Sequence, residues 1–170
     1  MDAIEAILSR RSIRKYKKEA LPKELIDELL KAGMNAPSAH NEQPWHFIVI
    51  QDRKVLNEIP KFHPYSGMLR EAPAAIVVCA DLRLAEDDKV WWVQDCSAAT
   101  ENILIAAQAK GLGAVWLGVY PKEDRVEGVK ALLALPQDII PLSIISIGYP
   151  AVKKPYESRY QTSRIHYDHW

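Results

Sequence analysis

The spacing of hydrophobic residues changes several times along the chain, and each change marks the limit of a predicted element. Helices are predicted over residues 2–9, 22–34 and 122–133, with a short helix over 52–59 and a long one over 95–110. Apolar runs predict strands over residues 46–51, 74–80, 114–119 and 142–148. Residues 61–70 are predicted to form an irregular loop. Helices and strands in this order favour an α+β fold in which helices cover a sheet.

Three segments carry patterns that bear on how the chain packs. The run 74–80 is almost entirely apolar, which is typical of a strand inside a sheet. The helix over 95–110 is apolar or small on most sides, so we expect burial all round, which a second subunit would make easier. Residues 150–170 lack periodicity but carry several aromatic side chains, so this tail is predicted to embrace the rest of the protein or a partner subunit.

Composition and charge then narrow the class of protein. The chain has 170 residues, of which 48% are hydrophobic, and a single domain over 1–170 is predicted. Basic and acidic residues number 22 each, and a chain without net charge is not a generic nucleic-acid binder. No targeting pattern or membrane-length apolar run is found, so a cytoplasmic location without membrane contact is predicted. Cys79 and Cys96 are expected to be separate buried thiols.

The run Arg10-Arg11-Ser12-Ile13-Arg14 is the most informative segment for chemistry. Guanidinium groups are planar, always charged and able to bind phosphate oxygens in bidentate fashion. The plainer alternative is a solvated basic loop, because cations are favoured at the C-terminal end of the preceding helix. Ser12, between the arginines, favours phosphate binding.

A second unusual loop runs from Ala36 to Trp45 with the sequence APSAHNEQPW. Asn41 and Gln43 carry amides that both donate and accept hydrogen bonds, as the pyrimidine edge of a flavin requires. The alternative is a connector between helix and strand, since proline, serine and asparagine are ordinary turn residues.

Several other motifs are excluded or have plainer explanations. Gly111 and Gly113 do not form a dinucleotide fingerprint, because Trp116 stands where a third glycine is needed, and a glycine at a helix C-terminus explains Gly111. Gly118, at the end of an apolar strand, permits a ligand to approach the backbone. The five histidines form no metal-binding pair on a helix, and no metal site is predicted. Of Trp91 and Trp92, one is expected in the core and one in a pocket.

In the order and spacing of these motifs the chain resembles the short form of the nitroreductase family of FMN-dependent oxidoreductases. The resemblance runs from the arginine segment through the 36–45 loop, Gln94-Asp95, Gly111-Leu112-Gly113 and Leu117-Gly118 to the tail around Arg159. It implies a mostly antiparallel sheet flanked by helices. It also implies an intertwined homodimer, with FMN at the subunit interface and the tail packed on the partner.

The resemblance further implies a set of cofactor contacts. Arg10, Ser12 and Arg14 would hold the FMN phosphate, with contacts from Arg11 and with Arg159 completing the clamp. The partner subunit would line the flavin ring with Pro37, Ser38, Ala39 and Asn41. Leu117 and Gly118 would offer main-chain groups near the reactive N5 atom of the ring. Many relatives have a second serine where this chain has Ala39, so that hydroxyl contact is expected to be missing. The 61–68 loop is a further candidate for the ring edge.

The implied reaction is a ping-pong hydride transfer from NAD(P)H through FMN to a nitroaromatic, quinone or related acceptor. The flavin carries this chemistry, so no catalytic side chain is named. Two alternatives keep the fold: dehalogenation, or oxidation or fragmentation of a substrate. A third is a flavin-binding or sensor protein without turnover. A fourth, a basic nucleic-acid module at residues 10–18, lacks interleaved aromatic residues and overall positive charge.

Overall fold

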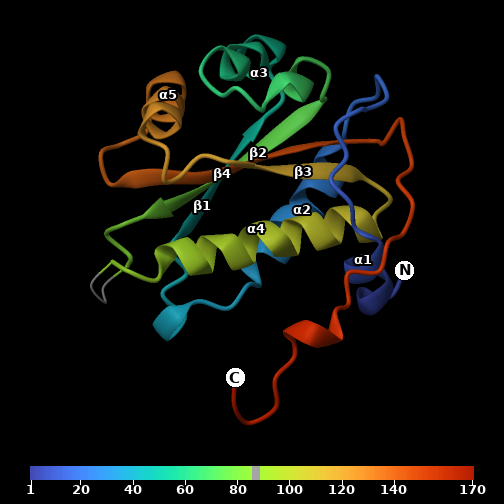
Figure 1. Cartoon of the computed structure of the whole chain (residues 1–170). Helices are drawn as coiled ribbons and strands as arrows, with labels where there is room; N and C mark the ends of the chain where they lie inside the picture. The colour runs from blue at the N-terminus through green and yellow to red at the C-terminus, as the bar shows by residue number, and fades with distance from the viewer. Residues whose placement is uncertain (86–88) are drawn as a thin grey trace.

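The structure is a computed structural model that describes residues 1–85 and 89–170. Its helices are α1 (Ala3–Ser9), α2 (Lys23–Met34), α3 (Arg53–Glu58), α4 (Trp92–Ala109) and α5 (Glu123–Leu133). Its strands are β1 (Trp45–Ile50), β2 (Ala74–Asp81), β3 (Gly113–Gly118) and β4 (Ile139–Gly148). Figure 1 shows these elements along the chain. Every predicted helix and strand is present.

The four strands form one antiparallel sheet in the order β1-β2-β4-β3. This arrangement confirms the expected α+β fold and its antiparallel sheet. β2 lies inside the sheet and is buried along its whole length, as its unbroken apolar run predicted. β4 begins three residues before the predicted start, because Pro141 does not end it. Pro141 stands opposite Cys79, where the register shifts, and an irregularity of this kind tolerates a residue without an N–H.

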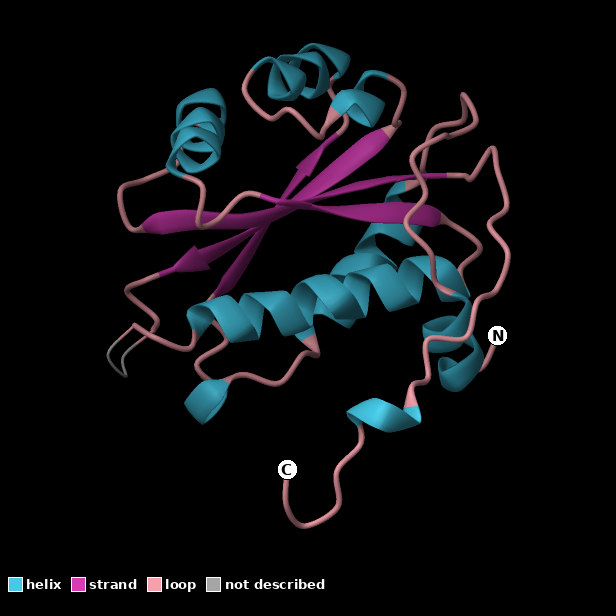
Figure 2. Cartoon of the chain, in the orientation of Figure 1, coloured by secondary structure: helices cyan, strands magenta, loops and turns pink. Residues whose placement is uncertain are grey.

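Buried side chains form one layer on each face of the sheet. α2 and α4 cover one face, and α3, α5 and the short turns beside them cover the other (Figure 2). β2 serves both layers, with Ile76 and Val78 in the first and Val77 and Cys79 in the second. Cys79 and Cys96 are buried and not joined, as expected.

Two short helices begin at a capping aspartate. The side chain of Asp2 accepts from the Glu5 amide at 2.9 Å, and that of Asp52 from the Lys54 amide at 2.7 Å. α4 begins at Trp92, three residues before its predicted start. The predicted irregular loop 61–70 contains the last residue of one short 3₁₀ turn, η2 (Ile59–Lys61), and the whole of another, η3 (Gly67–Arg70).

Burial of α4 on all sides is not found within the single chain. Cys96, Ile103 and Leu104 are buried against the sheet and its neighbours, whereas Ile105 and Ala106 are only half-buried and Ala109 is exposed. The apolar residues of α1 are even more open, since Ile4 is 65% exposed. The chain by itself therefore leaves apolar surface on these two helices in contact with water.

The C-terminal tail passes α1 and continues below α4 (Figure 1). It is tied down near its start, where the Ala151 amide donates to the Lys15 carbonyl at 3.0 Å. Further along it is exposed throughout, and Trp170 is completely so. The tail contacts its own chain over its first part, and its packing on a partner subunit stays a prediction.

Candidate functional site

The outer edge of β3 organises the candidate site. β3 has a neighbouring strand on one side only, and the arginine segment runs along the open side. Ser12 forms a parallel bridge with Ala114, and the Ile13 amide donates to the Ala114 carbonyl at 3.0 Å. Ile13 is buried beneath this edge. Packing of one apolar residue thus places the flanking arginines along the end of the sheet.

Arg159 lies beside the N-terminal arginines although about 150 residues of chain separate them. A small hollow of about 100 Å³ is lined by Ile7, Leu8, Arg10, Arg11, Tyr156, Glu157 and Arg159. The structure therefore brings together three of the four arginines that the sequence assigned to phosphate binding. Three guanidinium groups around so small a space favour an anion.

Arg11 is already engaged in holding the tail. It donates to the carbonyl oxygens of Leu8 at 2.9 Å and Glu157 at 3.0 Å, and its guanidinium lies 5.6 Å from the ring centroid of Tyr156. Arg10 is paired with Glu101 of α4 at 3.2 Å through its Nε atom, which leaves its terminal nitrogens for another partner. The two neighbouring arginines thus have different roles.

Arg14 lies in a different and larger hollow of about 590 Å³. The hollow is lined by Arg14, Lys15, Pro64, Tyr65, Gly67, Met68 and Glu71. One wall of the hollow is the 61–68 loop, which the sequence analysis named as a candidate for the ring edge. Aromatic and thioether side chains beside a guanidinium suit a flat, polar ring better than they suit a bare phosphate.

At the other end of β3, Gly118 has no side chain that would cover the main chain of the candidate site. A Cβ atom built on this glycine would meet nothing within 4 Å. Its carbonyl accepts from His63 and Arg125 rather than from β4, so its main-chain groups face the open edge, as those of Ala114 do. Leu117, by contrast, is paired opposite Ile144 and has a buried side chain.

The 36–45 loop is held in an unusual backbone conformation. His40, Asn41 and Gln43 all have positive φ, at 49°, 57° and 50°. The loop is closed by internal bonds, since the Gln43 amide donates to Ser38 Oγ at 3.0 Å and its side chain donates to Asn41 Oδ1 at 2.9 Å. Such left-handed positions are uncommon outside glycine and indicate a conformation imposed by the surroundings.

Asp95 attaches this loop to the first turn of α4, and sequence reasoning did not include it among the site residues. Its Oδ1 atom accepts from the Ala39 amide at 3.0 Å. The pKa of Asp95 is raised, mainly by burial. The hydrogen bond from Ala39 acts in the opposite direction, and the charge of Glu42 adds a smaller rise. The only signal in the sequence was the Gln94-Asp95 pair at the start of the alanine-rich segment.

The loop and the arginine segment lie apart within one chain. Ala39 is attached at Asp95, near the start of α4, whereas Arg10 is paired with Glu101 and Ser9 with Gln108, further along the same helix. Figure 1 shows the 3₁₀ turn of the loop and α1 at opposite ends of α4. Within the described chain the two candidate segments are therefore separate from each other.

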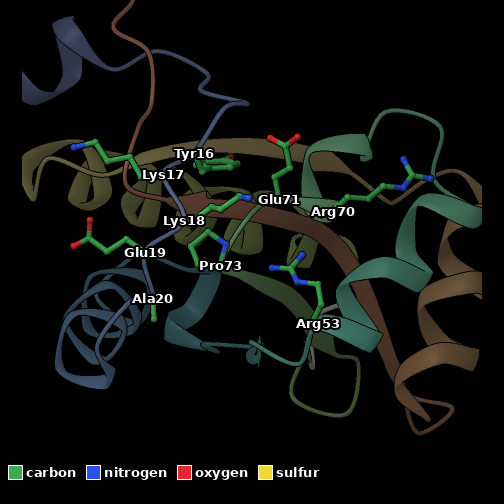
Figure 3. A pocket seen from close by; sticks show the side chains of 9 residues that line it. All are labelled: Tyr16, Lys17, Lys18, Glu19, Ala20, Arg53, Arg70, Glu71 and Pro73. Atoms are coloured by element: carbon green, nitrogen blue, oxygen red, sulfur yellow. The ribbon is translucent and has the colours of Figure 1, made fainter.

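Two other features adjoin the candidate segments, since Trp92 shares the first turn of α4 with Asp95 and a further hollow shares Glu71 with the Arg14 hollow. Trp92 is buried and packs edge-on against Tyr120, with ring centroids 4.8 Å apart, so it is the core tryptophan, whereas Trp91 is exposed. A hollow of about 610 Å³ lies around Tyr16, Lys18, Arg53 and Glu71 (Figure 3). Lys17 and Arg70 extend from it in opposite directions, and Arg53 is bonded to the carbonyls of Leu69 and Ala72. These cations do not converge on one point.

The residues around β3 fit the group that the sequence suggested. FMN requires cations for a phosphate at one end and main-chain or amide groups for a flat ring at the other. Arg10 and Arg159 would meet the first need and the uncovered Gly118 the second, while Arg14 and Tyr65 line the larger hollow. Within residues 1–85 and 89–170, no group of three His, Cys, Asp or Glu side chains could hold a metal ion. No helix in these ranges could cross a membrane.

The chain belongs to the nitroreductase family, whose model matches residues 7–62 and 61–149. A protein of Methanothermobacter thermautotrophicus, provisionally named NADH dehydrogenase/NAD(P)H nitroreductase, is 52% identical over 170 residues, covering 100% of this chain and 88% of the relative.

Two solved structures have the same fold. An FMN-dependent nitroreductase from Clostridium difficile superposes with a TM-score of 0.90 at 31% identity, covering 98% of this chain and 99% of that one. A provisionally named nitroreductase from Desulfovibrio desulfuricans, solved in complex with FMN, has a TM-score of 0.86 at 32% identity and covers 100% and 98% of the two chains.

Proposed function

We propose that this chain is an FMN-dependent oxidoreductase that uses NADH or NADPH to reduce small acceptors such as nitroaromatic compounds or quinones. The observation that carries the proposal is the pair of features at the two ends of β3: convergent arginines at one end and an uncovered glycine at the other. Family membership and the FMN named for two solved relatives support the same cofactor.

In this proposal the arginine segment is divided between the two parts of the cofactor. Arg10, Ser12 and Arg159 take the phosphate, while Arg11 keeps the tail in place so that Arg159 remains beside Arg10. Arg14, which the resemblance also places at the phosphate, lines the larger hollow and would contribute positive charge beside the ring there. When bound, FMN supplies the ring that accepts and passes on hydride. The chain itself then needs only to bind, orient and cover that ring.

A second copy of the chain completes the proposed site. The loop that carries Pro37, Ser38, Ala39 and Asn41 cannot reach the arginine segment of its own chain, because both are anchored at separate points of α4. The exposed apolar face of α1 and the aromatic tail give a partner surface to cover. A homodimer would bring the loop of one subunit to the β3 edge of the other.

Titration of the purified protein with FMN, followed by quenching of flavin fluorescence, tests these assignments. Replacing Arg10 or Arg14 with alanine should raise the Kd about 10- to 100-fold, because each removes a charge-assisted contact. Lys54→Ala is the matched control, since Lys54 is exposed on α3 and lines neither hollow of the candidate site. Equal Kd values for wild type, Arg14→Ala and Lys54→Ala would remove Arg14 from the site.

Turnover distinguishes an enzyme from a flavin-binding protein without activity. The FMN-loaded protein is reduced with NADH or NADPH and then mixed with a nitroaromatic compound or a quinone. Fast reoxidation, with parallel double-reciprocal plots in the steady state, is the expected result for a ping-pong enzyme. Reduction without reoxidation by any acceptor would favour flavin storage or sensing.

A further inference from the structure

His63 is a buried histidine whose ring contacts the Gly118 carbonyl of the candidate site. It lies between η2 and η3, is 1% exposed, and its Nε2 atom is 3.0 Å from the Gly118 carbonyl oxygen. Because a carbonyl oxygen only accepts, Nε2 carries the proton and donates. Among the described residues, the Nδ1 atom has no hydrogen-bond partner. Burial is the largest cause that lowers the pKa of His63, which keeps the ring neutral.

Arg125, at the start of α5, binds the same oxygen from another side. Its Nη1 atom donates to the Gly118 carbonyl at 2.8 Å, and its guanidinium lies 5.4 Å from the ring centroid of Tyr65. Tyr65 in turn lines the hollow that contains Arg14. Two separate elements therefore place donors on one carbonyl at the end of an edge strand.

This double contact counteracts the freedom of a glycine. Gly118 has no side chain to hold it, lies on the unpaired side of β3, and is exposed. The preceding residue, Leu117, is fixed by its buried side chain, and the Val119 amide is fixed by its bond to Leu142 at 3.0 Å. With the carbonyl also fixed, the backbone on both sides of Gly118 is constrained, and so is the direction of its amide N–H.

We propose that His63 and Arg125 are positioning residues that hold the Gly118 carbonyl and thereby orient the Gly118 main chain toward the ring of bound FMN. The inference rests on the proposed function, since it assigns these residues a role at the FMN site. Arg125 adds a second effect, because its positive charge beside Gly118 would favour the reduced, more negative form of a ring bound there.

The first test compares variants of His63. In His63→Gln the side-chain amide can still donate to the carbonyl, whereas His63→Leu has similar size and no donor. We expect His63→Leu to raise the Kd for FMN about 10-fold and to shift the visible spectrum of the bound flavin, with His63→Gln within about 3-fold of wild type. His46→Leu, on the exposed side of β1, is the control and should bind as wild type does.

The second test uses Arg125→Met, which keeps the apolar stem of a half-buried residue and so should fold. Reduced FMN should bind about 10-fold more weakly relative to oxidised FMN, which lowers the midpoint potential by ~30 mV for two electrons. Amide hydrogen exchange over residues 115–121, measured without FMN, should be faster in Arg125→Met and His63→Leu than in wild type.

These measurements distinguish a failure of the proposed function from a failure of the positioning role of His63 and Arg125. Wild-type protein that binds no FMN overturns the proposed function and with it any cofactor role of His63 and Arg125. Protein that binds FMN, with an unchanged Kd, spectrum, potential and exchange rate in both variants, overturns the positioning role alone. Equal losses in His63→Gln and His63→Leu also overturn it, because they would show that only the shape of the ring matters.

Discussion

At the scale of single residues, the geometry of the candidate site depends on which hydrogen-bond and ion-pair partners a few polar side chains have. Arg10 and Arg11 are adjacent in sequence, yet one is paired with α4 and the other with the tail. Two buried ionisable groups, Asp81 and His63, likewise differ in how many of their polar atoms have hydrogen-bond partners. Asp81 is 3% exposed and bonded to Arg83 through both carboxylate oxygens, whereas His63 has one ring nitrogen without a partner among the described residues.

His63 gives the folded protein a pH-dependent stability. Its pKa is lowered from 6.5 mainly by burial, so below that pH the unfolded chain binds a proton that the folded chain does not. The free energy of unfolding should therefore fall as pH drops below about 6.5, and His63→Gln should remove this part of the fall. Urea unfolding between about pH 7.5 and 5 measures it. Identical slopes in wild type and variant would contradict the assignment.

Asp81 provides an internal contrast at lower pH. The Arg83 hydrogen bond is the largest cause that lowers the pKa of Asp81, from 3.8 to about 2. The stability that Asp81 contributes is present above pH 3.8 and is lost only as the pH falls toward 2. Asp81→Asn should therefore flatten the acid limb of the stability curve and leave the slope above about pH 5 unchanged.

At the scale of elements, two glycines of β3 have opposite roles. A Cβ atom on Gly113 would lie 2.7 Å from the Cγ2 atom of Ile13, so Gly113→Ala should push away the arginine segment and cost about 1–3 kcal/mol. The Cβ atom of Gly118→Ala would have no atom within 4 Å. The free energy of unfolding should therefore change by less than about 0.5 kcal/mol, while the affinity for FMN falls. Denaturant unfolding and FMN titration of both variants check this. Similar stability losses would contradict it.

Asp95 should be replaceable by asparagine but not by alanine. An asparagine side chain keeps an acceptor for the Ala39 amide and removes a buried charge, so Asp95→Asn should stay within about 1 kcal/mol of wild type. Asp95→Ala leaves that amide without its partner and should cost about 1–3 kcal/mol. Thermal or urea unfolding of the two variants measures the difference. A stable alanine variant would show that the loop is held by its internal bonds alone.

At the scale of the whole molecule, the proposed function requires a second copy of the chain to complete the site. Wild-type protein should sediment as a dimer, and Ile4→Glu on the exposed face of α1 should shift it toward monomer and weaken FMN binding. Ile4→Leu keeps an apolar side chain and should behave as wild type. A monomeric wild type that binds FMN normally would show that the 36–45 loop is not shared between subunits.

Sequence reasoning reached the fold because apolar spacing and turn residues agree along most of the chain. β2 and its unbroken apolar run are the clearest case. It missed the first turn of α4, since tryptophan gives no start signal, and it missed the early start of β4, since proline normally ends a strand. Sequence reasoning did not identify His63, Arg125 and Asp95 for a different reason. Their importance comes from contacts with distant backbone groups, which local patterns do not record, apart from the Gln94-Asp95 pair at the start of α4.

The most direct test of the central claim is the visible spectrum of the purified protein, with the chromophore released by heat and identified by mass. We predict a yellow protein that releases FMN, with one FMN per chain. A colourless protein that also fails to bind added FMN would contradict the proposed cofactor and return the arginine segment to a solvated basic loop.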